Sequence, residues 1–166
     1  HGIASGDPLA DRVILWTRVT PADGHEGDVP VQWIIATDPD MRHPVYLGTV
    51  RTSEAADFTV KVDVPGLLPG HVYYYRFSAG DMLSPIGRTK TLPAHGAREA
   101  RLAAFCCSSY PTGFFNAYAD AAQRGDIDVA LHLGDYIYEY GKDGYACGDA
   151  EALQRLPEPR CELLAL

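Results

Sequence analysis

The sequence lacks any long hydrophobic run. No apolar segment approaches the roughly 20 residues that a membrane-spanning helix needs, and no signal-peptide pattern of basic and then apolar residues is present. Basic residues are also few, with 14 Lys and Arg against 22 Asp and Glu and a net charge of −8. Because nucleic acids and anionic membranes are held by basic surfaces, both are unexpected as partners.

Cysteine is sparse, with four residues at 106, 107, 147 and 161. Their spacing fits neither a CxxC motif nor the Cys/His pattern of a zinc finger. The adjacent pair, Cys106 and Cys107, does not easily bridge to itself. Cys147 and Cys161 lie in a polar stretch that contains Gly and Pro, where a disulfide and two free thiols are both open interpretations.

The residues that are present suit a folded protein rich in turns. The 166 residues are 46% hydrophobic and 22% charged, which is close to ordinary globular proteins. The 16 glycines and 12 prolines favour short elements over a helical bundle. Because the chain starts at His1 without a Met, we expect that upstream sequence has been removed.

Residues 1–93 have the pattern of short strands separated by turns. Residues 58–64 alternate apolar and polar side chains, which is typical of a strand buried on one face. Similar segments recur at intervals of roughly ten residues, as in a β-sandwich. The expected strands are 12–19, 31–37, 58–64, 72–77 and 88–92. The expected fold of residues 1–93 is therefore an all-β sandwich of the fibronectin-III or immunoglobulin type.

Residues 67–73 refine this prediction. They read Leu-Leu-Pro-Gly-His-Val-Tyr, the L-x-P-G-x-x-Y pattern of a tyrosine corner. In that motif the tyrosine hydroxyl bonds to backbone a few residues upstream and fixes the crossover between sheets. We therefore expect the Tyr73 hydroxyl to contact the turn before its strand.

A polar segment at 93–99 separates the sandwich from a second region, 100–166. Residues 101–107 and 127–133 have the composition of buried strands, and residues 114–124 have helical spacing. The apolar stripe of that helix comprises Phe114, Phe115, Tyr118, Ala121 and Ala122. A β-α-β unit of this kind has parallel strands joined by a right-handed crossover. Since one such unit cannot close a core on both faces of its sheet, we expect the incomplete start of an α/β domain.

Candidate metal ligands follow both of these strands. Cys106 and Cys107 end the first, and Asp135 follows Gly134 at the end of the second. Functional groups gather at the carboxyl ends of parallel strands. A carboxylate there is placed to bridge two cations that activate a shared water. A Gly-Asp pair taken alone is more typical of an ordinary turn.

Three ordered motifs resemble the PhoD family of alkaline phosphatases and phosphodiesterases, within the calcineurin-like metallophosphoesterase superfamily. The first is His-Gly-Ile-Ala-Ser-Gly-Asp-Pro at 1–8 with Val-Ile-Leu-Trp-Thr-Arg at 13–18. The others are Phe-Cys-Cys-Ser-Ser-Tyr at 105–110 and Leu-His-Leu-Gly-Asp-Tyr-Ile-Tyr-Glu at 131–139. The resemblance covers nearly the whole chain and implies a β-sandwich ahead of a metallophosphoesterase domain.

The resemblance also implies a metal centre and a reaction. PhoD-like enzymes hold Fe³⁺ with Ca²⁺, and the matching iron ligands here are Cys107, Asp135 and Tyr138. Asp135 would bridge iron to calcium, and a metal-activated hydroxide would attack a phosphate monoester or diester. The implied partner is therefore a phosphate ester substrate.

The residues themselves leave alternatives at these positions. A shift of one residue in the strand would exchange Cys106 for Cys107. Tyr136 and Tyr138 lie on the same side of an extended chain, so spacing does not choose between them. His132, inside the strand, is more typical of a packed or supporting histidine than of a ligand.

Some parts of the family pattern have no counterpart in this sequence. The Asn-His pair and the later histidines and aspartate of the family cannot be placed, so the catalytic residues are expected downstream. We therefore expect negligible phosphatase activity from the isolated 166 residues. The resemblance further implies export to the periplasm or the medium, by a twin-arginine signal that this chain does not contain.

A rival interpretation is a binding module without catalysis. The sandwich would then bind a surface or a carbohydrate, and the α/β part would be a degenerate, metal-free remnant. Exposed aromatics such as Trp16, Trp33 or Tyr46 would serve that role, although aromatics in strands are more typical of a core.

Overall fold

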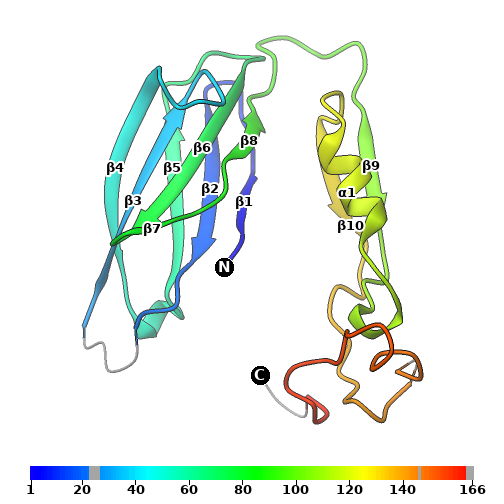
Figure 1. Cartoon of the computed structure of the whole chain (residues 1–166). Helices are drawn as coiled ribbons and strands as arrows, with labels where there is room; N and C mark the ends of the chain where they lie inside the picture. The colour runs from blue at the N-terminus through cyan, green and yellow to red at the C-terminus, as the bar shows by residue number, and fades with distance from the viewer. Residues whose placement is uncertain (23–26, 146, 164–166) are drawn as a thin grey trace. The chain divides into compact units, whose positions relative to one another are not determined.

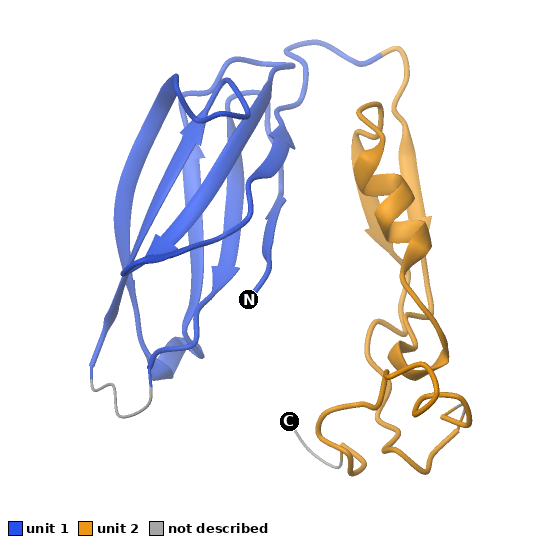
Figure 2. Ribbon diagram, in the orientation of Figure 1, with its two compact units in different colours: residues 1–97 blue, residues 98–166 orange. Residues whose placement is uncertain are grey.

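The computed structural model describes residues 1–22, 27–145 and 147–163. The chain divides into two compact units, residues 1–97 and 98–166, shown in different colours in Figure 2. The first unit consists mainly of strands, and the second contains an α-helix that lies between two strands along the chain (Figure 1). Among the described residues, no helix is both long and apolar enough to cross a membrane.

The first unit is built from two antiparallel sheets. One sheet has the order β1-β2-β5, and the other has β4-β3-β6 with both β7 and β8 on the free side of β6. The strands of the first sheet are β1 (Ile3–Gly6), β2 (Arg12–Arg18) and β5 (Thr59–Pro65). Those of the second are β3 (Val29–Ala36), β4 (Pro44–Thr52), β6 (Val72–Ala79), β7 (Met82–Leu83) and β8 (Gly87–Lys90). A short 3-10 helix, Glu54–Ala56, precedes β5.

The core of this unit lies between its two sheets. Along β2, β5 and β6, buried residues alternate with more exposed ones, so each strand turns one face inward. The fully buried side chains include Leu15 of β2, Val64 of β5 and Ile35 of β3. The predicted β-sandwich is therefore confirmed.

Three strands of the sandwich were absent from the sequence prediction: β1, β4 and β7. β4 pairs only with β3 and exposes Val45, Tyr46 and Leu47. Its first four residues are all exposed, and the alternation over its last five involves small and polar residues as well as Val50, so the apolar pattern is weak. β1 and β7 are four and two residues long, too short for periodicity to show.

The predicted tyrosine corner is present. The backbone N–H of Leu68 donates a hydrogen bond to the Tyr73 hydroxyl at 2.8 Å. The hydroxyl of buried Thr91 donates to the carbonyl oxygen of Leu68 at 2.7 Å. Two side chains thus satisfy both backbone groups of Leu68 and fix the turn between β5 and β6.

We expect Tyr73→Phe to destabilise the sandwich by about 1–2 kcal/mol, because the Leu68 N–H loses its partner in a partly buried site. Urea unfolding measures the change. Tyr46→Phe is a matched control, because its hydroxyl donates a longer 3.3 Å bond to Gly66 at an exposed position. That variant should change stability by less than about 0.5 kcal/mol. Equal losses in the two variants would contradict a structural role for the corner.

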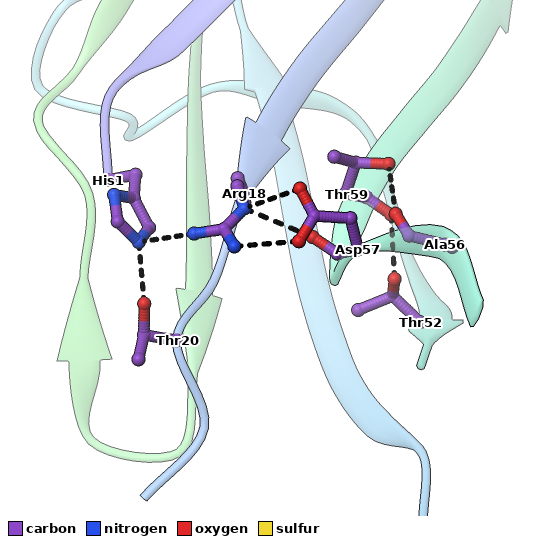
Figure 3. A network of polar contacts seen from close by, with 7 residues as sticks. All are labelled: His1, Arg18, Thr20, Thr52, Ala56, Asp57 and Thr59. Atoms are coloured by element: carbon purple, nitrogen blue, oxygen red, sulfur yellow. Dashed lines mark hydrogen bonds and ion pairs between the residues drawn. The ribbon is translucent and has the colours of Figure 1, made fainter. Parts of the chain in front are cut away.

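A polar network ties β2 to the turn before β5 (Figure 3). The Arg18 guanidinium donates to both carboxylate oxygens of Asp57, at 3.1 and 2.7 Å, and also to the Asp57 carbonyl oxygen. The hydrogen bonds from Arg18 lower the pKa of Asp57 below its ordinary value. The backbone of Asp57 is in the left-handed conformation, with φ 50°.

We expect the stability supplied by this pair to depend on pH. A carboxyl whose pKa is lowered on folding stabilises the protein above its unfolded pKa of about 3.9, and this contribution is lost as the pH falls through the folded value. Asp57→Asn removes the charge while keeping a residue that tolerates left-handed backbone. The stability difference between wild type and variant should be present at neutral pH and vanish in acid. Asp81→Asn, in the exposed turn after β6, is the control. A stability difference for Asp57→Asn that does not change with pH, or an equal effect of Asp81→Asn, would contradict this prediction.

The second unit is a β-α-β unit. Its strands β9 (Leu102–Phe105) and β10 (Val129–His132) are parallel and pair Leu102 with Val129 and Phe105 with His132. They are joined through a 3-10 turn (Tyr110–Thr112) and helix α1 (Asn116–Gln123). Leu102, Val129 and Leu131 of this two-stranded sheet are exposed. The predicted parallel β-α-β unit is confirmed, and these exposed side chains show that nothing among the described residues fully covers one face of its sheet.

Two predicted boundaries in this unit are wrong. The first strand ends at Phe105, so Cys106 and Cys107 belong to the loop. The helix begins at Asn116, after Phe114 and Phe115. The two phenylalanines instead pack beside the guanidinium of Arg155, 5.0 Å from each ring centroid. The apolar spacing that predicted one helix over 114–124 therefore comes from two adjacent structures, an aromatic loop and a short helix.

Candidate metal centre

The loops that follow β9 and β10 are joined by main-chain hydrogen bonds. The Leu133 N–H donates to the carbonyl oxygen of Phe105 at 2.8 Å, which extends the strand pairing by one residue. Beyond it, Cys107 N–H donates to Gly134 at 3.1 Å, and Ser108 N–H donates to Asp135 at 2.8 Å. The carboxyl edge of the sheet therefore holds Cys107 and Asp135 side by side.

Two of the three candidate ligands have left-handed backbone. Cys107 has φ 61° and Asp135 has φ 53°, and Gly134 between the strand and Asp135 has φ 132°. For residues with a side chain, such a conformation costs about 1–3 kcal/mol each and persists where the surroundings impose it. Such strained residues cluster at functional sites, because the unusual backbone aims side chains that regular strands would direct elsewhere.

The three predicted ligands converge on one oxygen atom. The Cys107 thiol lies 3.6 Å from Asp135 Oδ2, and the Tyr138 hydroxyl lies 3.3 Å from the same atom. A thiol, a carboxylate and a phenol from two loops thus share one point at the strand ends. All three groups are metal ligands when deprotonated.

The electrostatics of this cluster disfavour a bare phenolate. The pKa of Tyr138 is raised above its ordinary value, first by the hydrogen bond with Cys107, then by burial and the Asp135 charge. The pKa of Cys106 is also raised, chiefly by a hydrogen bond with Cys107. Deprotonation of these groups beside the Asp135 carboxylate needs a compensating positive charge, which is what a bound cation would provide.

The structure places the alternatives that the residues left open differently relative to Asp135. Cys107, not Cys106, contacts the Asp135 carboxylate. Tyr138 also contacts it, whereas Tyr136 is 68% exposed and packs edge-on against His132, with ring centroids 5.1 Å apart.

His132 lies beside this cluster, in contact with two residues that sequence reasoning missed. Its Nε2 atom is 2.8 Å from the Ser108 hydroxyl and 2.9 Å from the Tyr118 hydroxyl. Ser108 and Tyr118 also contact each other. Tyr118 belongs to α1 and packs on Phe105 of β9, 4.6 Å between ring centroids. No sequence signal singled out Ser108 or Tyr118, because a serine after a cysteine pair and an aromatic in a helix are both common.

An aromatic pocket of about 380 Å³ adjoins the cluster. Its lining includes Tyr118, Tyr138 and Tyr140, together with both Cys147 and Cys161. These two cysteines are free thiols, so the disulfide left open by the sequence does not form here. Cys147 is buried, and Cys161 is exposed.

The donor set is mixed in type. Across residues 1–22, 27–145 and 147–163, no three His, Cys, Asp or Glu side chains gather closely enough to hold a metal ion. The candidate centre consists of one thiol, one carboxylate and one phenol. A tyrosine ligand suits a hard, strongly charged cation rather than the Cys/His sites typical of zinc.

The chain matches known phosphatases along most of its length. Residues 1–93 match the PhoD-like phosphatase N-terminal domain, and residues 102–166 match the PhoD-like phosphatase family. Alkaline phosphatase D of Bacillus subtilis (strain 168) is 46% identical over 151 residues, which cover 87% of this chain and 26% of that protein. A solved structure of PhoD has a TM-score of 0.76 and 46% identity, and covers 84% of this chain and 28% of its own. The chain thus spans about a quarter of these relatives, and it belongs to the PhoD-like phosphatase family.

Proposed function

We propose that this chain carries the first part of the active site of a phosphoric ester hydrolase that acts on phosphate monoesters, diesters or both. The observation that supports it best is the approach of Cys107 and Tyr138 to Asp135 Oδ2, at the carboxyl edge of a parallel sheet. Family membership supports the reaction class, since the relatives are phosphatases. The rest of the catalytic apparatus would come from sequence that this chain does not include.

The donor chemistry fits the two metals that the resemblance implies. Cys107 and Tyr138 would hold Fe³⁺, which is acidic enough to keep a thiolate and a phenolate deprotonated. Asp135 would reach both Fe³⁺ and Ca²⁺, because calcium prefers oxygen ligands. Once bound, the cations would neutralise phosphoryl charge and lower the pKa of a water nucleophile.

The chain's own residues prepare this site before any cation binds. The hydrogen bonds from Cys107 N–H and Ser108 N–H hold the two loops together. They keep the donor groups close, so that binding does not have to order both loops. Such pre-organisation lowers the entropic cost of binding.

We extend the proposal to export into the periplasm or the medium through a twin-arginine signal encoded outside this chain. That route suits an enzyme that receives its iron before transport. Fractionation of cells that express the whole gene, with and without its signal, tests this part separately.

The rival, a metal-free binding module, has less support. Trp16 and Trp33 are only partly exposed, and the Trp33 indole packs closely over Gly48. The approach of a thiol and a phenol to one carboxylate oxygen also favours a metal centre over a metal-free remnant.

Iron analysis of the full-length protein tests the proposal. We expect Cys107→Ala and Tyr138→Phe to lower both the iron content and the rate of phosphate ester hydrolysis. Cys161→Ala and Tyr145→Phe are controls, because both parent residues are exposed and neither is a predicted metal ligand. Iron at the wild-type level in both ligand variants would contradict the assigned ligands.

A further inference from the structure

We propose that His132 is a positioning residue that holds the two loops of the candidate metal centre at a fixed separation, with Ser108 and Tyr118 as its partners. This inference rests on the proposed function, because it concerns how that centre is kept in shape. His132 is the last residue of β10 and lies three residues before Asp135.

Both ring nitrogens of His132 are engaged, one toward each loop. Nε2 lies 2.8 Å from the Ser108 hydroxyl, and Ser108 directly follows Cys107. The Gly134 N–H donates to Nδ1 at 3.3 Å, and Gly134 directly precedes Asp135. One imidazole therefore connects the neighbours of two predicted ligands.

These contacts define the tautomer of the ring. A backbone N–H can only donate, so Nδ1 must accept, and the neutral ring then carries its hydrogen on Nε2. Nε2–H donates toward the hydroxyls of Ser108 and Tyr118. With Nδ1 accepting and Nε2 donating, the ring has no lone pair free for a cation, so it acts through Cys107 and Asp135.

Helix α1 contacts the His132 ring through Tyr118. Tyr118 contacts both Ser108 and His132, and its ring packs on Phe105 of β9. The position of His132 is thereby set by the sheet and the helix rather than by the loops. This matters because Cys107 and Asp135 have left-handed backbone that would relax without support.

Substitutions of His132 in the full-length protein separate its two contacts. Asparagine places its amide oxygen near the Nδ1 position and keeps the Gly134 contact. Glutamine places its amide nitrogen near the Nε2 position and keeps the Ser108 contact. His132→Ala loses both. Groups that orient metal ligands typically contribute about 10–100-fold in affinity, so we expect a loss of that size in iron affinity for His132→Ala and a smaller loss for the other two.

The readouts are iron affinity, by competition with a chelator, and the visible absorption of the ferric phenolate, which responds to ligand geometry. Ser109→Ala is the matched control, because the neighbouring serine makes no side-chain capping bond in its turn. Should His132→Ala fail to fold, Ser108→Ala removes only one hydroxyl of the network and should still lower iron affinity and alter the absorption.

Two results would overturn this inference while leaving the proposed function intact. One is wild-type iron affinity and absorption in both His132→Ala and Ser108→Ala. The other is a loss of iron in His132→Ala and His132→Gln as complete as in Asp135→Asn, which would make His132 a ligand. A wild-type protein that binds no iron would instead remove the proposed function and this inference with it.

Discussion

Replacing Asp135 by asparagine should lower kcat/KM of the full-length protein by at least about 1,000-fold. Metal ions supply several kcal/mol of charge stabilisation in the transition state, and each 1.36 kcal/mol corresponds to a factor of ten in rate. Asp135 Oδ2 is the atom that both Cys107 and Tyr138 approach. Loss of its charge would weaken the binding of both cations that it is proposed to bridge.

The asparagine variant isolates charge from backbone effects. Asp135 has φ 53°, and asparagine tolerates this left-handed conformation about as well as aspartate does. The fold should therefore persist while iron and calcium content fall together. Asp143→Asn is the control, in an exposed loop of the same unit. Hydrolysis within tenfold of wild type for Asp135→Asn would rule out its bridging role.

The sandwich was predictable because its central strands are buried on one face. Alternation along residues 58–64 corresponds to the buried valines of β5, and the L-x-P-G-x-x-Y pattern corresponds to an observed hydrogen bond from Leu68 to Tyr73. The edge strand β4 was not predicted, because its first four residues are all exposed and its single buried residue is a threonine, Thr52.

The candidate site was predictable only in part. Spacing placed Cys107 and Asp135 at the ends of parallel strands, but the choice of Tyr138 depended on family resemblance. The contact between Tyr138 and Asp135 arises from the turn after Gly134, which puts Asp135 at φ 53°. The periodicity of apolar residues predicts regular strands, but it carries no information about the conformation of such a turn.

The sequence indicated a packed or supporting role for His132, but its partners Ser108 and Tyr118 were beyond sequence reasoning for a related reason. The three residues come from a loop, a helix and a strand, and they meet only because α1 packs on β9. Their separation along the chain carries no motif. Long-range packing of this kind needs the three-dimensional structure.

Replacing Gly134 by alanine should lower kcat/KM by at least about 100-fold, although no metal donor is removed. Gly134 has φ 132°, which is glycine's region, so alanine must change the backbone at that point even though the space around it is open. That change would move Asp135 and disturb the bonds of Gly134 with Cys107 and His132. A shift of about 1 Å in a catalytic group costs about 100-fold in rate.

Two comparisons make this prediction specific. Gly125→Ala, at a glycine without positive φ and with open space around it, should leave hydrolysis within about twofold of wild type. Adding Gly134→Ala to Asp135→Asn should cost little beyond the single Asp135→Asn change, because both act on the same carboxylate and changes within one network are not additive. Full additivity of the two losses would show that Gly134 acts elsewhere, whereas strong non-additivity would link its left-handed backbone to the placement of Asp135.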